Sequence, residues 1–81
     1  MYRLLLVDDE KIERNGILFL MRQLHLQLQV TEAANGKEAL EYLSKNPVDI
    51  LLTDVKMPFM DGITLLEHVS KQYPDMKKII F

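Results

Sequence analysis

Short apolar runs recur along this chain and are separated by longer segments of mixed character. Residues 4–7, 50–53 and 79–81 are almost continuously apolar, whereas residues 26–33 alternate less regularly. Apolar runs without polar alternation are typical of strands that are covered on both faces, as in parallel sheets. The pattern therefore predicts four short strands, most of them buried.

The segments between the runs have the spacing of amphipathic helices. Residues 10–24 predict one apolar helix face, formed by Ile12, Ile17, Leu20, Met21 and Leu24. A shorter helix is expected over residues 39–46, because Pro47 stops it. A third helix follows Asp61, a good N-cap. Alternating strands and helices with short connections predict an α/β fold with an open parallel sheet and helices on both faces.

The composition is that of an ordinary globular domain. The 81 residues are 48% apolar and 27% charged, with a net charge of −2 and no cysteine. The basic residues are scattered, which argues against a nucleic-acid surface. No stretch approaches the roughly 20 apolar residues of a membrane span. We therefore expect one domain in a cytoplasmic chain that contacts neither nucleic acid nor membrane.

Three aspartates stand directly after predicted strands: Asp8 and Asp9 after the first, and Asp54 after the third. Ligands of parallel sheets collect at the carboxyl ends of the strands. If the two strands are neighbours, the three carboxylates converge and repel one another unless a cation compensates. Mg²⁺ suits such a site, since it takes one or two carboxylates and then coordinates phosphate oxygens. Asp8 or Asp9 is also expected to cap the first helix.

Two motifs resemble those of a known family. The runs Val7-Asp8-Asp9-Glu10 and Asp54-Val55-Lys56-Met57-Pro58-Phe59-Met60-Asp61-Gly62 are similar to the receiver domain of two-component response regulators. The resemblance implies a flavodoxin-like (CheY-like), doubly wound sheet. Its strand order would be 2-1-3-4, with the last strand and last helices missing. Residues 1–81 would then be the N-terminal part of a receiver domain, without the effector domain.

The resemblance also assigns roles to residues. Asp54 would be the phosphoacceptor, phosphorylated by a histidine kinase, so that the chain is a substrate and not an enzyme. Asp9 would bind Mg²⁺ directly, Asp8 through water, and Lys56 through its backbone carbonyl, with Asp54 completing the metal site. The effector would be a DNA-binding domain that regulates transcription. A Ser or Thr and a Lys that the family pattern requires would lie beyond Phe81.

Other interpretations stay open. The chain could be a fold fragment without phosphotransfer competence, in which the exposed edge strand Lys78–Phe81 pairs with a second copy as a homodimer. A phosphatase of the haloacid dehalogenase type is a further alternative, but it needs a second acid where Lys56 stands. We expect a kinase to contact the first turns of the first helix, and we expect His25 and His68 to be surface residues.

Overall fold

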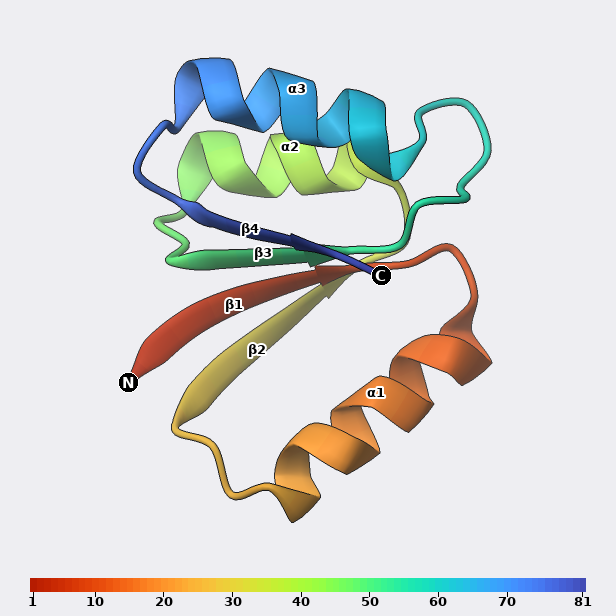
Figure 1. Ribbon diagram of the computed structural model, residues 1–81, viewed down its shortest axis with the longest axis vertical. Coiled ribbons are helices and arrows are strands. Elements are labelled where there is room, and N and C mark those ends of the chain that lie inside the picture. Colours follow the sequence, from red (N-terminus) through yellow and green to blue (C-terminus); the bar gives the residue numbers. More distant parts are fainter.

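The computed structural model describes all 81 residues and contains one parallel sheet of four strands, in the order β2-β1-β3-β4 (Figure 1). The strands are β1 (Tyr2–Val7), β2 (Leu28–Ala33), β3 (Ile50–Thr53) and β4 (Lys77–Ile80). This order confirms the prediction. In register, Val7 of β1 lies beside Thr53 of β3, so the residues that follow these two strands emerge at the same edge of the sheet.

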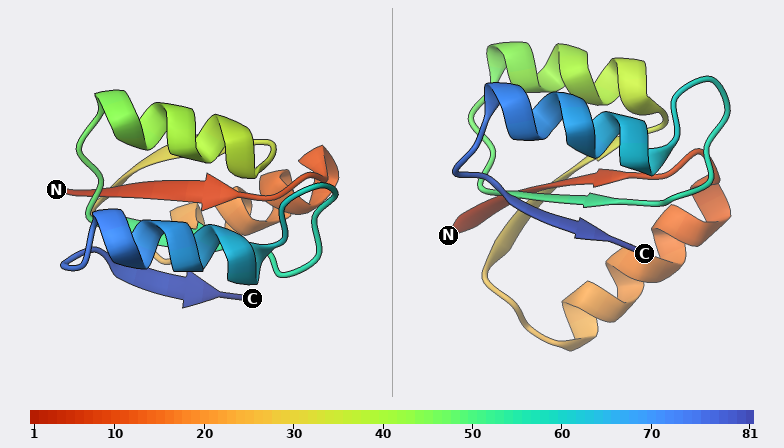
Figure 2. Two further views of the ribbon diagram at one scale, coloured as in Figure 1. Left: turned by 90° about the horizontal axis from the view of Figure 1, so that it is seen from above. Right: turned by 45° about the horizontal axis from the view of Figure 1, so that its top comes forward.

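Helices cover both faces of the sheet, as predicted. Helix α1 (Lys11–Gln23) lies on one face, and α2 (Gly36–Lys45) and α3 (Gly62–Gln72) lie side by side on the other (Figures 1 and 2). Helix α3 begins as expected, because the Asp61 carboxylate accepts a hydrogen bond from the Thr64 backbone N–H at 2.8 Å. Each helix links two parallel strands, which the chain can join only by a crossover.

The core lies between the sheet and the pair α2 and α3. The side chains of Leu5, Val7 and Leu51 point to this face and are fully buried. The helices contribute buried aliphatic residues, chiefly Ala39, Leu43, Leu65 and Val69, and the loops add Met57 and Met76. Met60 is partly buried against the same cluster. This layer anchors the two segments that follow β1 and β3.

Helix α1 is attached much more loosely, and the predicted apolar stripe on it is partly wrong. The helix contains no fully buried residue. Ile17 and Met21 are half-buried, but Ile12, Leu20 and Leu24 are 86%, 63% and 66% exposed. The helix is turned so that Arg14 faces inward, because its guanidinium finds acceptors at the end of the sheet. The orientation of α1 therefore depends on these polar contacts of Arg14, which the spacing of the apolar residues does not reveal.

The start of α1 also differs from the prediction. Its N-cap residue is Glu10, whose side chain makes no capping hydrogen bond. The Asp8 carboxylate instead accepts a hydrogen bond from the Glu10 backbone N–H at 2.9 Å, which closes a turn just before the helix. Asp8 thus shapes the connection between β1 and α1 without capping the helix.

Strand β4 forms one edge of the sheet and pairs only with β3. Ile79, Ile80 and Phe81 there are 51%, 36% and 40% exposed. Pairing of this edge with a second copy stays a prediction. His25 and His68 are exposed, as expected. None of the helices has both the length and the apolar character that crossing a membrane requires.

Candidate functional site

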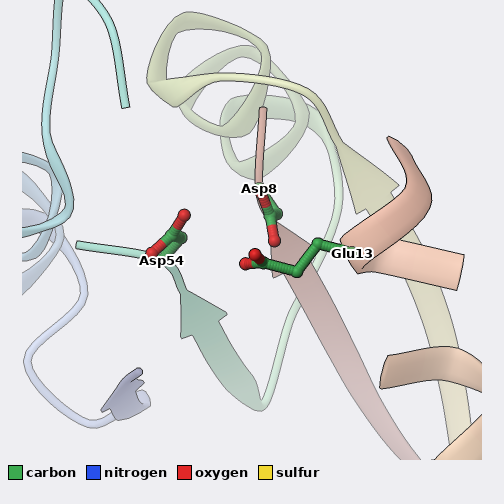
Figure 3. Close-up of side chains that lie close together, drawn as sticks. All are labelled: Asp8, Glu13 and Asp54. Carbon is green, nitrogen blue, oxygen red and sulfur yellow. The ribbon is translucent and has the colours of Figure 1, made fainter. Parts of the chain in front are cut away.

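Three carboxylates meet at the carboxyl end of the sheet (Figure 3). Asp8 follows β1, Asp54 follows the adjacent strand β3, and Glu13 lies on the first turn of α1. One oxygen of each can be chosen so that the three atoms lie within 4.8 Å of one another. The structure thus brings together two of the predicted acids, Asp8 and Asp54, and adds a third that the sequence analysis did not name. We call these three residues the acidic cluster.

Asp8 is the most buried member of the acidic cluster, with no exposed surface. Its Oδ1 accepts the hydrogen bond from Glu10, whereas its Oδ2 has no hydrogen-bond partner. A buried carboxylate oxygen without a donor is costly, because the charge has lost its water. A proton or a cation bound to this oxygen would offset that cost.

Glu13 shows the electrostatic consequence of the cluster. Its close contact with the Asp8 carboxyl group, with which it can share a hydrogen bond, raises the pKa of Glu13 to about 7. Loss of solvent and the negative charges of Asp8, Asp54 and Glu10 act in the same direction. Without a cation, the protein thus responds to crowded carboxylates by holding a proton at near-neutral pH.

Asp54 is held by its backbone and leaves its side chain partly accessible. Its N–H donates to the Val7 carbonyl at 2.9 Å, and its carbonyl accepts a hydrogen bond from the Thr53 hydroxyl at 3.0 Å. The residue is half-buried, so a reactant can reach its carboxylate. Asp54 therefore combines a fixed backbone with an accessible oxygen, which a nucleophile requires.

The loop from Asp54 to α3 is tightly packed at some positions and open at others. Met57 enters the core, and Met60 packs on Gly36. Phe59 is fully exposed, with a φ of 70°. The Lys56 side chain is exposed as well. Binding of a metal by the Lys56 carbonyl stays a prediction.

Asp9 does not join the acidic cluster; it is exposed beside it. Its role as a direct metal ligand also stays a prediction. Sequence reasoning missed Glu13 because it considered only acids that follow strands directly. The available signal was an acid on the first turn of the helix after β1, where a side chain points back toward the end of the sheet.

Arg14 fixes the segment that carries these acids. Its guanidinium donates to the backbone carbonyl of Asp8 and, from Nε, to a carboxylate oxygen of Glu32 at 3.0 Å. The Arg14 side chain is only 13% exposed. This residue therefore ties α1 to the ends of β1 and β2 without neutralising the acidic cluster itself.

The cluster fits a hard divalent cation. All its donor atoms are carboxylate oxygens, the ligands that Mg²⁺ and Ca²⁺ prefer. The unpartnered Oδ2 of Asp8 supplies a buried, negatively charged oxygen that a cation would satisfy. Residues from the ends of two strands and one helix would hold the ion.

Comparisons with known proteins agree with this geometry. The family model of the response regulator receiver domain matches residues 4–81. The transcriptional regulatory protein YesN of Bacillus subtilis is 38% identical over 81 residues, which are 99% of this chain and 22% of that protein. The sensor kinase CckA of Brucella abortus is 41% identical over 94% of this chain and 8% of its own length.

Solved structures are similar over almost the whole chain. A two-component transcriptional regulator AraC from Clostridium phytofermentans superposes with a TM-score of 0.89 at 41% identity, covering 99% of this chain and 65% of that one. The response regulator TrrA of Thermotoga maritima, crystallised with Mg²⁺-BeF, gives 0.90 at 29% identity, covering 99% and 68%. The chain spans about a fifth or less of the two curated relatives named above. With its sheet order, its acidic cluster and the matched family model, this chain belongs to the response regulator receiver domain family.

Proposed function

We propose that this chain is the phosphoacceptor part of a two-component response regulator, phosphorylated on Asp54 by a histidine kinase in a Mg²⁺-dependent reaction. The observation that carries the proposal is the accessible Asp54 carboxylate beside the buried, unpartnered Oδ2 of Asp8. A nucleophile and a cation-binding oxygen thus lie at one edge of the sheet.

In the proposed reaction, a carboxylate oxygen of Asp54 attacks the phosphorus of a phosphohistidine. The new bond joins that oxygen to phosphorus, and the bond from phosphorus to the imidazole nitrogen breaks. The nitrogen keeps the electron pair and takes a proton from solvent, and Asp54 becomes an acyl phosphate. The backbone hydrogen bonds of Asp54 hold the nucleophile in position during this exchange.

Asp8 would hold the magnesium ion through water, and Asp54, Asp9 and the Lys56 carbonyl would bind it directly, as the resemblance implies. When bound, the ion neutralises negative charge on the phosphoryl oxygens. Mg²⁺-BeF in the crystals of TrrA supports this part of the proposal, because that protein and this chain share the fold closely. A crystal structure of TrrA with the histidine kinase ThkA supports a kinase as partner.

We propose one kind of effector for the phosphorylated protein, although the relatives differ in the activity of the whole protein. Relatives include transcriptional regulators, protein-glutamate methylesterases and a sensor kinase. Similarity to YesN and to the Clostridium AraC regulator favours a DNA-binding effector that regulates transcription. The receiver segment would then be a kinase substrate in the cytoplasm, and its phosphorylation would switch this effector.

The test is intact mass spectrometry after incubation with acetyl phosphate and Mg²⁺. We expect a gain of one phosphoryl group that hydroxylamine removes, and we expect Asp54→Asn to abolish it. Asp75→Asn is the matched control, because this exposed acid lies outside the cluster. A gain that persists in Asp54→Asn would contradict the proposal. So would its absence from a wild-type protein that binds Mg²⁺.

A further inference from the structure

Glu13 is the member of the acidic cluster that lies outside both acidic motifs. Its side chain extends from α1 toward Asp8 and Asp54 (Figure 3). We propose that Glu13 is a further carboxylate ligand of the divalent cation, so that the ion is held jointly by α1 and the ends of β1 and β3. The inference rests on the proposed function, since it concerns the same cation.

The first argument is the lack of any other positive group at the cluster. The protein has two ion pairs, Arg3 with Asp49 and Arg14 with Glu32, and neither includes a cluster carboxylate. Arg14 is the nearer of the two arginines, but its hydrogen bonds go to Glu32 and to the Asp8 backbone. No basic side chain of the protein therefore neutralises these carboxylates, so a bound cation would meet no competing positive charge there.

The second argument comes from the buried oxygen of Asp8, which is independent of the clustering of acids. Asp8 Oδ2 has no exposed surface and no donor, and Figure 3 shows the Asp8 carboxyl group turned toward Glu13. Two carboxylates whose oxygens lie within 4.8 Å repel each other unless a positive charge lies between them. Because one oxygen of Asp8 and one of Glu13 lie within 4.8 Å of each other, an ion bound to the Asp8 carboxylate would also lie within reach of Glu13.

The separation of the oxygens limits how an ion can be held. Mg²⁺ binds oxygens at about 2.1 Å, so two of its ligands lie at most about 4.2 Å apart. Ca²⁺ binds at about 2.3–2.6 Å and spans up to about 5.2 Å. The three cluster oxygens lie within 4.8 Å of one another, which is inside the span of Ca²⁺ and close to that of Mg²⁺. Loss of Glu13 should therefore weaken the binding of both ions.

The experiment is isothermal titration calorimetry of the chain with Mg²⁺ and, separately, with Ca²⁺ at pH 8. Glu13→Gln should weaken binding of both ions by about tenfold or more, since even an indirect partner of a metal site typically contributes this much. Glu10→Gln is the matched control: it removes the same charge from the preceding turn but lies outside the cluster. It should have a much smaller effect. Equal effects of the two substitutions would overturn the inference.

A second measurement needs no metal. In EDTA at pH 8, Glu13→Gln should raise the melting temperature, because it removes repulsion from Asp8 and Asp54. If Glu13 served only to hold α1 in place, its replacement would lower the melting temperature.

Glu13→Asp, which keeps the charge on a shorter side chain, should retain part of the affinity for the cation. A wild-type protein that binds Mg²⁺ through Asp8, with unchanged affinity in Glu13→Gln, would refute this inference alone. A wild type that binds neither ion would refute the proposed function as well.

Discussion

Gly62 lies directly against the backbone carbonyl of Asp54, so closely that a β-carbon at position 62 would overlap that oxygen. The Gly62 N–H also donates to the Val55 carbonyl at 2.8 Å. Gly62 has no positive φ, so its requirement is one of space and not of backbone conformation. The first residue of α3 thus fixes the position of the proposed phosphoacceptor.

Gly62→Ala should therefore destabilise the protein by about 2 kcal/mol or more, because the atom in the way is backbone and cannot turn aside. Gly16→Ala is the matched control, since a β-carbon there meets nothing within 4 Å. In the middle of α1 it should instead stabilise by about 0.5–1 kcal/mol. Urea unfolding measures both. Similar values for the two variants would contradict the packing described for Gly62.

The ion pair of Arg3 and Asp49 predicts how the stability of the fold depends on pH in the acid range. The Asp49 carboxylate accepts hydrogen bonds from the Arg3 side chain at 3.0 and 3.1 Å and from its N–H at 2.8 Å. These bonds lower the pKa of Asp49 from 3.8 to about 2. A lowered pKa stabilises the folded state above the unfolded value, and this contribution is lost as the pH falls through the folded one.

Stability from this pair should thus be complete above about pH 4 and disappear toward pH 2. Asp49→Asn should flatten that part of the curve of unfolding midpoint against pH. Asp75→Asn, in an exposed acid without such partners, should leave the slope unchanged. If both variants keep the wild-type slope, the ion pair does not govern acid stability.

Arg14 should matter for stability more than an exposed arginine does, because its side chain is only 13% exposed. Arg14→Met leaves both Glu32 and the Asp8 carbonyl without their donor, at an expected loss of about 1–3 kcal/mol. A double-mutant cycle with Glu32→Gln should give a coupling of at least about 0.5 kcal/mol. Arg22→Met is the comparison, since Arg22 is exposed and makes no ion pair. Additive effects of the Arg14 and Glu32 substitutions would argue against a direct contact.

Asp61 should stabilise α3 as its N-cap. The hydrogen bond from the Thr64 N–H lowers the pKa of Asp61, which marks a bond that favours the charged carboxylate. Asp61→Ala should cost about 1 kcal/mol in thermal or urea unfolding, and Asp61→Ser should recover most of it. An equal loss in both variants would mean that something other than capping is involved.

The sequence predicted those parts of the fold in which a single physical factor dominates. Strand β3 was predicted with its observed bounds, because its apolar run is continuous and short. The meeting of Asp8 and Asp54 followed from the parallel order of neighbouring strands. The orientation of α1 could not be predicted in the same way, because it depends on Arg14 contacts with residues distant in sequence. Glu13 was missed because the sequence analysis considered only acids directly after strands, and not the first turn of the helix that follows β1.

The weak attachment of α1 separates the stability of the fold from the integrity of the acidic cluster. Helix α1 has no fully buried residue, yet it carries one of the three carboxylates. Local opening of α1 would dismantle the cluster while the core beneath α2 and α3 stays folded. The apparent dissociation constant of a cation would then be its intrinsic value divided by the fraction of molecules with α1 docked. Two proteins of this fold with equal melting temperatures could thus differ widely in the fraction of molecules whose acidic cluster is assembled.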